Sequence, residues 1–249
     1  AMNQDQVKEK LLQIDDDNRN MFTVANQVIG GGVHTQRVIY TESHDEVGDL
    51  NARRRVPDDI DPADPDSYFA RKRSTLGAGI LLTSPGIPMM FMGQEILEQG
   101  IWGETNPLDW DNLTEYPGVV AMYRDMIRLR RNFDGVSQGL KGPNVNVYHV
   151  NNEPGSKLIA YHRWDGGGPG DDVVVLANFT NTTFADYQLG FPLAGTWYTV
   201  FNGDSTFYGA DYGNAGSLTV DASGGPLHGL NHSASVEIGP YSMMAFSQA

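Results

Sequence analysis

The residues best able to support chemistry form one short stretch, residues 38–47, with the sequence Val-Ile-Tyr-Thr-Glu-Ser-His-Asp-Glu-Val. Its first part is apolar and β-branched, which is typical of a buried strand. Polar residues then follow, and His44 beside Asp45 could present an imidazole and a carboxylate to one bound molecule. The same spacing also fits residues that cap a strand and hydrogen-bond a loop, so the His-Asp pair alone leaves both interpretations open.

A second stretch repeats this arrangement. Residues 89–92 are Met-Met-Phe-Met, bounded by Pro and Gly, which predicts a short strand covered on both faces, and polar residues follow it. In alternating α/β proteins, ligands bind at the carboxyl ends of parallel strands. The sequence therefore predicts that the polar residues after the two strands lie at one rim: Glu42, His44, Asp45, Gln94 and Glu95.

Several other kinds of chemistry have no support in the sequence. The chain has no cysteine, which excludes thiolate nucleophiles, disulfides and cysteine-bound metal centres. It also lacks a His-Glu-x-x-His metal motif, a Gly-x-Ser-x-Gly nucleophile motif and the glycine-rich motifs of nucleotide sites. We therefore predict neither a metal nor a cofactor.

The chain of 249 residues has 17 basic and 31 acidic side chains, which gives a formal charge of −14. Nucleic acids and anionic membranes bind basic surfaces, so neither is expected as a partner. Two charged clusters are predicted to be solvated: an exposed, paired loop at the arginines 53–55 and a turn at the aspartates 15–17. No apolar run is long enough for a membrane span and the first ten residues are polar, so a cytoplasmic location is expected.

The elements that would position the rim alternate between helix and strand. Apolar spacing predicts three helices, over residues 18–29, 68–82 and 116–132. It also predicts two strands, over residues 37–41 and 88–92. Prolines within residues 45–65 are expected to prevent any regular element there. The alternation implies parallel strands with helical crossovers. Two strands leave open sheet edges, so we expect a helix, a loop or a second copy of the chain, as a homo-oligomer, to cover them.

The composition changes near residue 135, where charged helix formers give way to Gly, Asn, Thr and aromatic residues. Short strands separated by turn residues are predicted over residues 146–151, 157–163, 173–180, 183–190, 195–202, 217–221, 235–238 and 243–247. This pattern predicts an antiparallel β-sandwich, and with it a division into two domains, residues 1–135 and 136–249.

Several of these segments together resemble the α-amylase superfamily, glycoside hydrolase family thirteen. Residues 38–47, with the core Glu-Ser-His-Asp, resemble that family's fourth signature region. Three later segments of the chain resemble the segments that follow this region in the family, above all in its branching-enzyme-like members. They are residues 72–76 (Lys-Arg-Ser-Thr-Leu), 85–95 (Pro-Gly-Ile-Pro-Met-Met-Phe-Met-Gly-Gln-Glu) and 107–110 (Pro-Leu-Asp-Trp). The strands from residue 144 onward resemble the family's trailing β-domain. The resemblance covers essentially the whole chain, and the order and spacing of its motifs make it specific.

The resemblance implies both a fold and a site. Residues 1–135 would be the C-terminal part of a catalytic (β/α)8 TIM barrel with its seventh and eighth strands, and residues 136–249 the β-sandwich behind it. Asp45 would stabilise the transition state by hydrogen-bonding the 2- and 3-hydroxyls of the central sugar, and His44 would bind the same sugar. Further candidates for substrate binding are Glu42, Glu95 and Trp110, although the turn favours a buried packing role for Trp110 over sugar stacking.

The function that the resemblance implies is action on an α-1,4-glucan such as starch or glycogen. Most similar is 1,4-α-glucan branching, in which an α-1,4 link is cleaved by a retaining mechanism and the chain is transferred to a 6-hydroxyl. An α-amylase-type hydrolase is the alternative, and Ser43, where amylases commonly have Asn, favours branching. The family's nucleophile and acid/base lie on the fourth and fifth barrel strands, which this sequence does not contain, so the chain alone is expected to be inactive. A non-catalytic glucan-binding or structural role is the alternative of another class.

Overall fold

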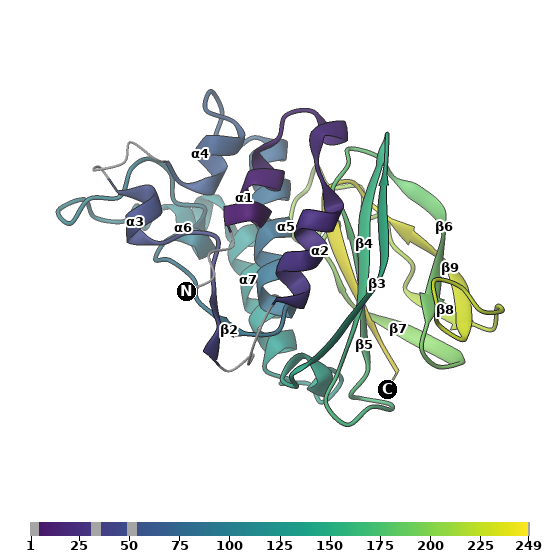
Figure 1. Ribbon diagram of the computed structural model, residues 1–249. Coiled ribbons are helices and arrows are strands. Elements are labelled where there is room, and N and C mark those ends of the chain that lie inside the picture. The colour runs from purple at the N-terminus through teal and green to yellow at the C-terminus, as the bar shows by residue number, and fades with distance from the viewer. Residues whose placement is uncertain (1–4, 31–35, 49–53, 249) are drawn as a thin grey trace.

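A computed structural model describes residues 5–30, 36–48 and 54–248 of the chain. A mixed α/β part comes first and an antiparallel all-β domain follows, as the sequence predicts (Figure 1). Helices of the first part lie in a layer against one face of the larger sheet of the second. Among the described helices, none has the length and apolar character needed to cross a membrane.

The α/β part is built from helices and short strands with local start signals. Asn20 caps α2 (Met21–Ile29) by accepting hydrogen bonds from two backbone N–H groups, and Ser67 caps α5 (Tyr68–Thr83) by accepting from one. The other α-helices and strands among the described residues of this part are α1 (Asp5–Leu12), β1 (Val38–Ile39), α3 (His44–Val47), α4 (Val56–Ile60), β2 (Ile87–Pro88), α6 (Asn112–Glu115) and α7 (Pro117–Arg130). The three predicted helices are confirmed as α2, α5 and α7, with small differences at their ends.

The prediction that residues 45–65 hold no regular element is wrong. The helix α3 reaches into this stretch and α4 lies within it. Pro57 occupies the first turn of α4, where a helix makes no hydrogen bond from its backbone N–H groups, so the missing N–H of proline is tolerated. The proline therefore starts a helix here instead of preventing one. Residues 49–53 of this stretch lie outside the described residues.

The strands β1 and β2 pair in parallel, as predicted, with Ile39 opposite Pro88. Both are shorter than expected, and the strand predicted over residues 88–92 is wrong in extent because β2 ends at Pro88. The backbone then enters a turn in which Gly93 adopts a left-handed φ of 91°, a conformation that favours glycine. As a result Met92 is 52% exposed and is not covered on both faces.

The all-β domain consists of two antiparallel sheets. The larger sheet has the strand order β3-β4-β5-β10-β7-β8, and the smaller pairs β6 with β9. The strands are β3 (Asn144–Glu153), β4 (Ser156–Trp164), β5 (Val173–Asn178), β6 (Phe184–Phe191), β7 (Gly195–Asn202), β8 (Thr219–Ala222), β9 (His232–Ile238) and β10 (Ser242–Ser247). Buried residues such as Leu176, Trp197 and Phe246 fill the space between the sheets. All the strands predicted here are confirmed, with ends that differ by a few residues.

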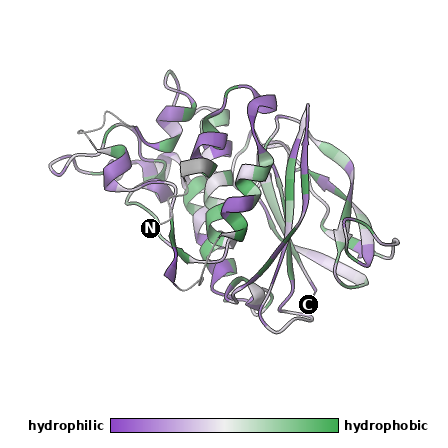
Figure 2. Cartoon of the chain, viewed as in Figure 1, coloured by the Kyte–Doolittle hydropathy of each residue, from purple (hydrophilic) through white to green (hydrophobic). Residues whose placement is uncertain are grey.

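A second hydrophobic core joins the α/β part to the β domain. The helices α2 and α5 contact the larger sheet, and Val24 and Ile80 belong to one buried cluster with Ile159 and Val175 of the sheet. Figure 2 shows hydrophobic residues along these helices and the strands that face them, whereas the lobe with α3 and α4 is mostly hydrophilic. The α/β part is therefore held by burial of apolar surface against the sheet.

A fully buried ion pair also joins the two parts. Lys72 of α5 lies 2.6 Å from Asp204 in the loop after β7, and both side chains are 0% exposed. Asp204 also accepts a hydrogen bond from the N–H of Ala215, and the Lys72 ammonium lies 4.4 Å from the centre of the Tyr212 ring. Burial lowers the pKa of Lys72, and the carboxylate of Asp204 opposes that shift.

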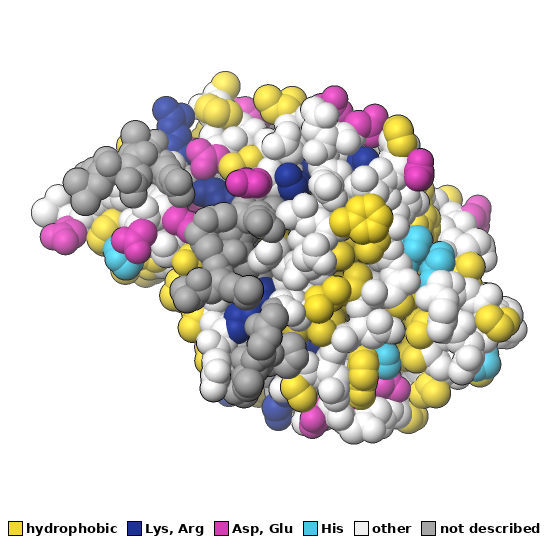
Figure 3. Space-filling model, in the orientation of Figure 1, with side chains coloured by type: hydrophobic (Ala, Val, Ile, Leu, Met, Phe, Trp, Pro, Cys, Tyr) yellow, Lys and Arg dark blue, Asp and Glu magenta, His cyan; other side chains and the backbone are white. Residues whose placement is uncertain are grey.

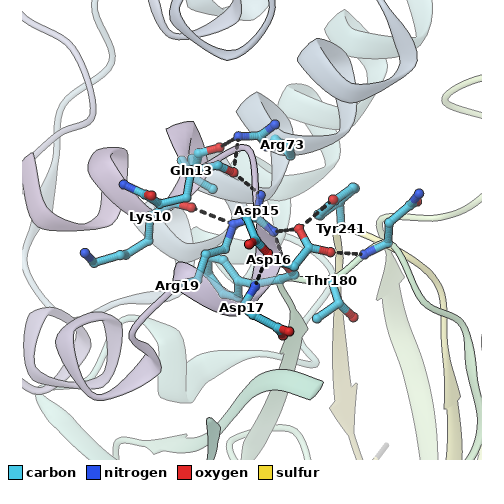
Figure 4. Close-up of polar contacts among 12 residues, drawn as sticks. Lys10, Gln13, Asp15, Asp16, Asp17, Arg19, Arg73, Thr180 and Tyr241 are labelled. Carbon is cyan, nitrogen blue, oxygen red and sulfur yellow. Dashed lines mark hydrogen bonds and ion pairs between the residues drawn. The ribbon is translucent and has the colours of Figure 1, made fainter. Parts of the chain in front are cut away.

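The turn between α1 and α2 forms a further polar connection to the β domain (Figure 4). Arg19, 1% exposed, pairs with Asp16 and donates a hydrogen bond to the carbonyl of Phe179, next to β5. Asp16 accepts from the hydroxyl of Tyr241 at 2.7 Å and from a backbone N–H of the loop between β5 and β6 at 2.8 Å. Asp17 accepts a hydrogen bond from the N–H of Gly155, between β3 and β4, at 2.6 Å. The predicted solvated turn at residues 15–17 therefore contains two aspartates that contact the β domain.

Candidate active site

His44 and Asp45 lie together where the chain leaves β1 and enters α3, beyond the carboxyl end of the strand (Figure 1). The Nε2 atom of His44 is 3.2 Å from Oδ1 of Asp45, and the two side chains are 65% and 80% exposed. Figure 3 shows acidic and histidine side chains on the lobe that carries α3. The two residues are adjacent and accessible, as chemistry on a bound molecule requires.

Trp102 supports the imidazole of His44 from the side. The two rings meet edge to face with their centroids 6.2 Å apart, and Trp102 meets Phe91 in the same way at 5.8 Å. The backbone N–H of Trp102 donates to the carbonyl of Val47 at the end of α3. Sequence reasoning missed Trp102 because it lies in a stretch without helix or strand periodicity. The only feature of the sequence that could have indicated a role for Trp102 is its residue type, a tryptophan in the loop after the second predicted strand.

Glu42 is buried and supports the rim from behind. Its side chain is 1% exposed, accepts a hydrogen bond from the N–H of Val56 at 2.6 Å and lies 3.5 Å from the guanidinium of Arg55. Burial raises the pKa of Glu42, while the hydrogen bond from Val56 and the charge of Arg55 oppose the rise. The pocket beside Glu42 has a volume of about 10 Å³, the size of one water molecule. Glu42 therefore anchors the start of α4, a different position from the accessible one expected of a sugar contact.

The prediction of an exposed arginine loop is wrong for Arg55. Its side chain is 2% exposed, donates to the carbonyl of Met92 at 2.9 Å and lies over the ring of Phe91. Arg54 is exposed as predicted, and Arg53 lies outside the described residues. The physical reason is the buried carboxylate of Glu42, because an unpaired charge in the interior is strongly destabilising and requires a partner.

Gln94 joins the ends of the two strands. Its Nε2 atom donates to Oγ1 of Thr41 at 2.8 Å, and its Oε1 atom accepts from the N–H of Phe91 at 2.7 Å. The structure thus brings Gln94 to the end of β1, in the place that the predicted rim requires.

Glu95 is half-buried and held within its own turn. Its carboxylate accepts from the N–H of Gly93 at 3.1 Å. Burial, followed by the charges of Glu42 and Glu95, raises the pKa of Tyr123 in α7. Both carboxylates therefore lie close enough to α7 for their charges to act there.

Trp110 lies in the turn before α6 and is 61% exposed. The N–H of Asp109 donates to the carboxylate of Glu98 at 3.0 Å, which holds the turn in place. The buried packing role that the sequence favoured for Trp110 is therefore wrong. An exposed indole can stack on the apolar face of a ligand.

Among the residues that the structure describes, no group of three or more His, Cys, Asp or Glu side chains is arranged to hold a metal ion. The groups at the end of β1 are the hydrogen-bonding side chains of His44, Asp45 and Gln94, with the ring of Trp102 beside His44, and such groups suit a neutral ligand with many hydroxyl groups.

Comparisons with known proteins identify the family of the chain. A family model described as "Alpha amylase, C-terminal all-beta domain" matches residues 148–249. The 1,4-alpha-glucan branching enzyme GlgB of Pseudomonas syringae pv. syringae is 29% identical over 213 residues, which cover 84% of this chain and 28% of that enzyme. The enzyme of the same name from Paramagnetospirillum magneticum is 31% identical over 213 residues, with coverages of 83% and 27%. The chain thus spans little more than a quarter of the length of these relatives.

Solved structures share the fold. Apo pullulanase from Paenibacillus barengoltzii aligns with 100% of this chain at a TM-score of 0.67 and 19% identity, and 38% of that chain is covered. Pullulanase from Anoxybacillus sp. LM18-11, complexed with maltotetraose, aligns with 99% of this chain at a TM-score of 0.64 and 18% identity, with 35% of that chain covered.

The order of an α/β part and an all-β domain, together with these matches, defines the class: the chain belongs to the α-amylase family, as a C-terminal region of it. Within that family, the curated relatives given above are glucan branching enzymes. The predicted resemblance and the predicted fold class are both confirmed.

Proposed function

We propose that the chain is part of an α-glucan-active enzyme of the 1,4-α-glucan branching class. Such an enzyme cleaves an α-1,4 link by a retaining mechanism and transfers the chain to a 6-hydroxyl. The observation that carries the proposal is the exposed His44–Asp45 pair beyond β1, in a chain similar to branching enzymes. In this proposal residues 1–135 are the C-terminal part of the catalytic (β/α)8 barrel and residues 136–249 are the β-sandwich.

Asp45 stabilises the transition state in this proposal. Retaining cleavage passes through an oxocarbenium-like state in which hydrogen bonds to the 2-hydroxyl of the sugar strengthen. A carboxylate is a strong acceptor for such bonds, and the carboxylate of Asp45 is accessible at the rim. His44 binds a hydroxyl of the same sugar, and the edge contact with Trp102 orients its ring.

The remaining candidates divide into sugar contacts and supports. Trp110 stacks on a further sugar unit, and Glu95 hydrogen-bonds the substrate after leaving its turn. Glu42, which the sequence suggested as a sugar contact, instead positions the rim through Arg55 and the start of α4. The nucleophile and the acid/base, two carboxyl groups about 5–5.5 Å apart in retaining enzymes, belong to other parts of the longer enzyme.

Incubation of the longer enzyme with amylose tests the proposal. Branching lowers the iodine absorbance without new reducing ends, and this is the expected result. Asp45→Asn should lower the rate by about 10²–10³-fold, the loss typical of one electrostatic contact in the transition state. Asp186→Asn, an exposed aspartate in β6, is the matched control and should leave the rate unchanged. New reducing ends without branching would favour the hydrolase, and an unchanged rate in Asp45→Asn would refute its role.

A further inference from the structure

A pocket of about 360 Å³ lies where the start of α7 meets the loop between β7 and β8. We call it the α7 pocket. Its walls include Arg71, Glu115, Tyr116, Phe207 and Tyr208. None of these residues belongs to the rim proposed for the reaction. The volume falls within the range of small-molecule binding sites, roughly 300–1,000 Å³.

Phe207 is an exposed aromatic residue that the loop holds in place. It is 71% exposed, and its N–H donates to the hydroxyl of Ser205 at 3.3 Å. The N–H of Thr206 donates to the side chain of Asn214 at 3.4 Å, and that of Tyr208 to the carbonyl of Ser205 at 3.0 Å. A large aromatic ring kept in water by an ordered loop loses little conformational freedom when a ligand covers it.

The opposite wall is fixed as well. The hydroxyl of Tyr208 donates to Asp125 at 2.7 Å, and that of Tyr116 donates to Asp66 at 2.9 Å. A Cβ atom on Gly118 would lie 1.9 Å from the carbonyl oxygen of Tyr208, so α7 and the loop approach as closely as only glycine allows. The pocket is therefore formed before any ligand binds.

The polar groups of the pocket select a neutral ligand. Arg71 makes two hydrogen bonds to the carboxylate of Asp211, at 2.6 and 3.1 Å, so its charge is already compensated. Glu115 adds an exposed carboxylate at the rim of the pocket. An anionic ligand would meet this uncompensated negative charge. A ring with an apolar face and hydroxyl edges matches the exposed phenyl of Phe207 and the planar polar groups beside it.

We propose that the α7 pocket binds a segment of α-1,4-glucan away from the reacting rim. The inference rests on the proposed function for the identity of the glucan. It places Phe207 as the stacking platform and Arg71 and Glu115 as hydrogen-bonding groups for the sugar hydroxyls. A long glucan would thus contact the enzyme at two separate places, and the pocket would hold the polymer near the rim.

Calorimetric titration of the 249-residue chain with maltoheptaose tests the pocket. The wild type should bind, Phe207→Ala should weaken binding at least tenfold, and Phe207→Trp should retain binding because an aromatic platform remains. Phe133→Ala is the matched control, since Phe133 is 66% exposed and is not part of the pocket wall. It should bind as the wild type does. Thermal unfolding of each variant checks that the fold is kept.

A further variant separates the pocket from the rim. Asp45→Asn removes a proposed rim contact and leaves the pocket intact, so binding that survives Asp45→Asn and is lost in Phe207→Ala is the expected result. Binding that is lost in Asp45→Asn and kept in Phe207→Ala would overturn the pocket and leave the proposed function standing. The pocket is also overturned if the wild type does not bind or if Phe133→Ala weakens binding equally. An equal response to cellohexaose, a β-linked glucan, would overturn the assignment to α-glucans.

Discussion

The rim and the junction between the two parts of the chain use charged side chains in opposite ways. At the rim, His44 and Asp45 are 65% and 80% exposed on a helix of only four residues. At the junction, Lys72 and Asp204 are 0% exposed and 2.6 Å apart, and Arg19 is 1% exposed. The charges at the junction connect distant segments of the chain, whereas those at the rim are accessible to a ligand.

This difference teaches that charge by itself does not mark a functional residue. A charge in the interior must be paired because its desolvation is unfavourable, so Lys72 and Arg19 are explained by the fold that they hold together. An exposed carboxylate such as that of Asp45, which is 80% exposed, contributes little to stability. Mutations at the junction should therefore change the free energy of unfolding, and mutations at the rim should change the chemistry.

The largest effect is expected at the buried ion pair. Lys72→Met leaves the carboxylate of Asp204 buried without its cation and should lower the free energy of unfolding by about 3–5 kcal/mol. Urea unfolding followed by circular dichroism measures this change. Arg71→Met is the matched control one residue away, because it breaks a pair with Asp211 that is 20% and 47% exposed and should cost less than about 1 kcal/mol. Equal losses in the two variants would contradict the difference between buried and exposed charge.

The turn before α2 should show the next largest effect. Asp16→Ala removes the partner of Arg19 and the acceptor of the Tyr241 hydroxyl, and should cost about 2–3 kcal/mol. Asp15→Ala removes only a cap within the turn and should cost about 1 kcal/mol. Urea unfolding of both variants gives their free energies of unfolding. The two values test whether the contacts with the β domain contribute more to stability than the contacts within the turn. The interpretation fails if Asp15→Ala is the more destabilising of the two.

Helices and strands with a clear apolar or strand-forming pattern of their own were predicted correctly from the sequence. The apolar spacing over residues 116–132 and the strand-forming residues over 195–202 each describe one element, and both elements form, as α7 and β7. The errors arose where a single residue redirects the backbone. Pro57 lies in the first turn of α4, and Gly93 adopts a left-handed φ in the turn that follows the end of β2 at Pro88. Propensity alone does not distinguish a proline in a first turn from one that breaks a helix.

The candidate site was also predicted only in part from the sequence. The sequence places His44 and Asp45 at a strand end, and the structure has them adjacent and exposed there. It does not reveal that Glu42 faces inward, because its partner Arg55 comes from a different segment and the distance between them is set by tertiary packing. Trp102 was missed for the same reason, since its contact with His44 joins α3 to a distant loop that has no periodicity.

The β domain contains a pair of stacked histidines whose protonation should change the free energy of unfolding. His149 of β3 and His228 stack with their ring centroids 3.7 Å apart, and burial, with the charge of His228, lowers the pKa of His149 to about 4. In the unfolded chain the pKa of His149 is about 6.5, so the folded protein binds a proton at His149 less readily than the unfolded chain does. The contribution to stability is therefore complete above about pH 6.5 and is lost as the pH falls through about 4. We expect a loss of roughly 1–2 kcal/mol, because solvent reaches the partly buried ring.

Urea unfolding at a series of pH values checks this loss. His149→Gln should unfold with a shallower dependence on pH between about 6.5 and 4, since the group that titrates is gone. A pH dependence identical to that of the wild type would show that the stability loss arises elsewhere.

The smallest change in stability is expected at the rim, and this result would sharpen the comparison most. Asp45→Asn and His44→Gln should each alter the free energy of unfolding by less than about 0.5 kcal/mol, because both side chains are largely in water. Glu42→Gln is the matched control three residues from Asp45: its side chain is 1% exposed and paired with Arg55, so it should cost about 1–3 kcal/mol. A loss above about 1 kcal/mol in Asp45→Asn would assign Asp45 a structural role like that of Glu42. Unchanged stability, combined with the loss of branching activity in the longer enzyme, would place the function of Asp45 in its contact with the substrate.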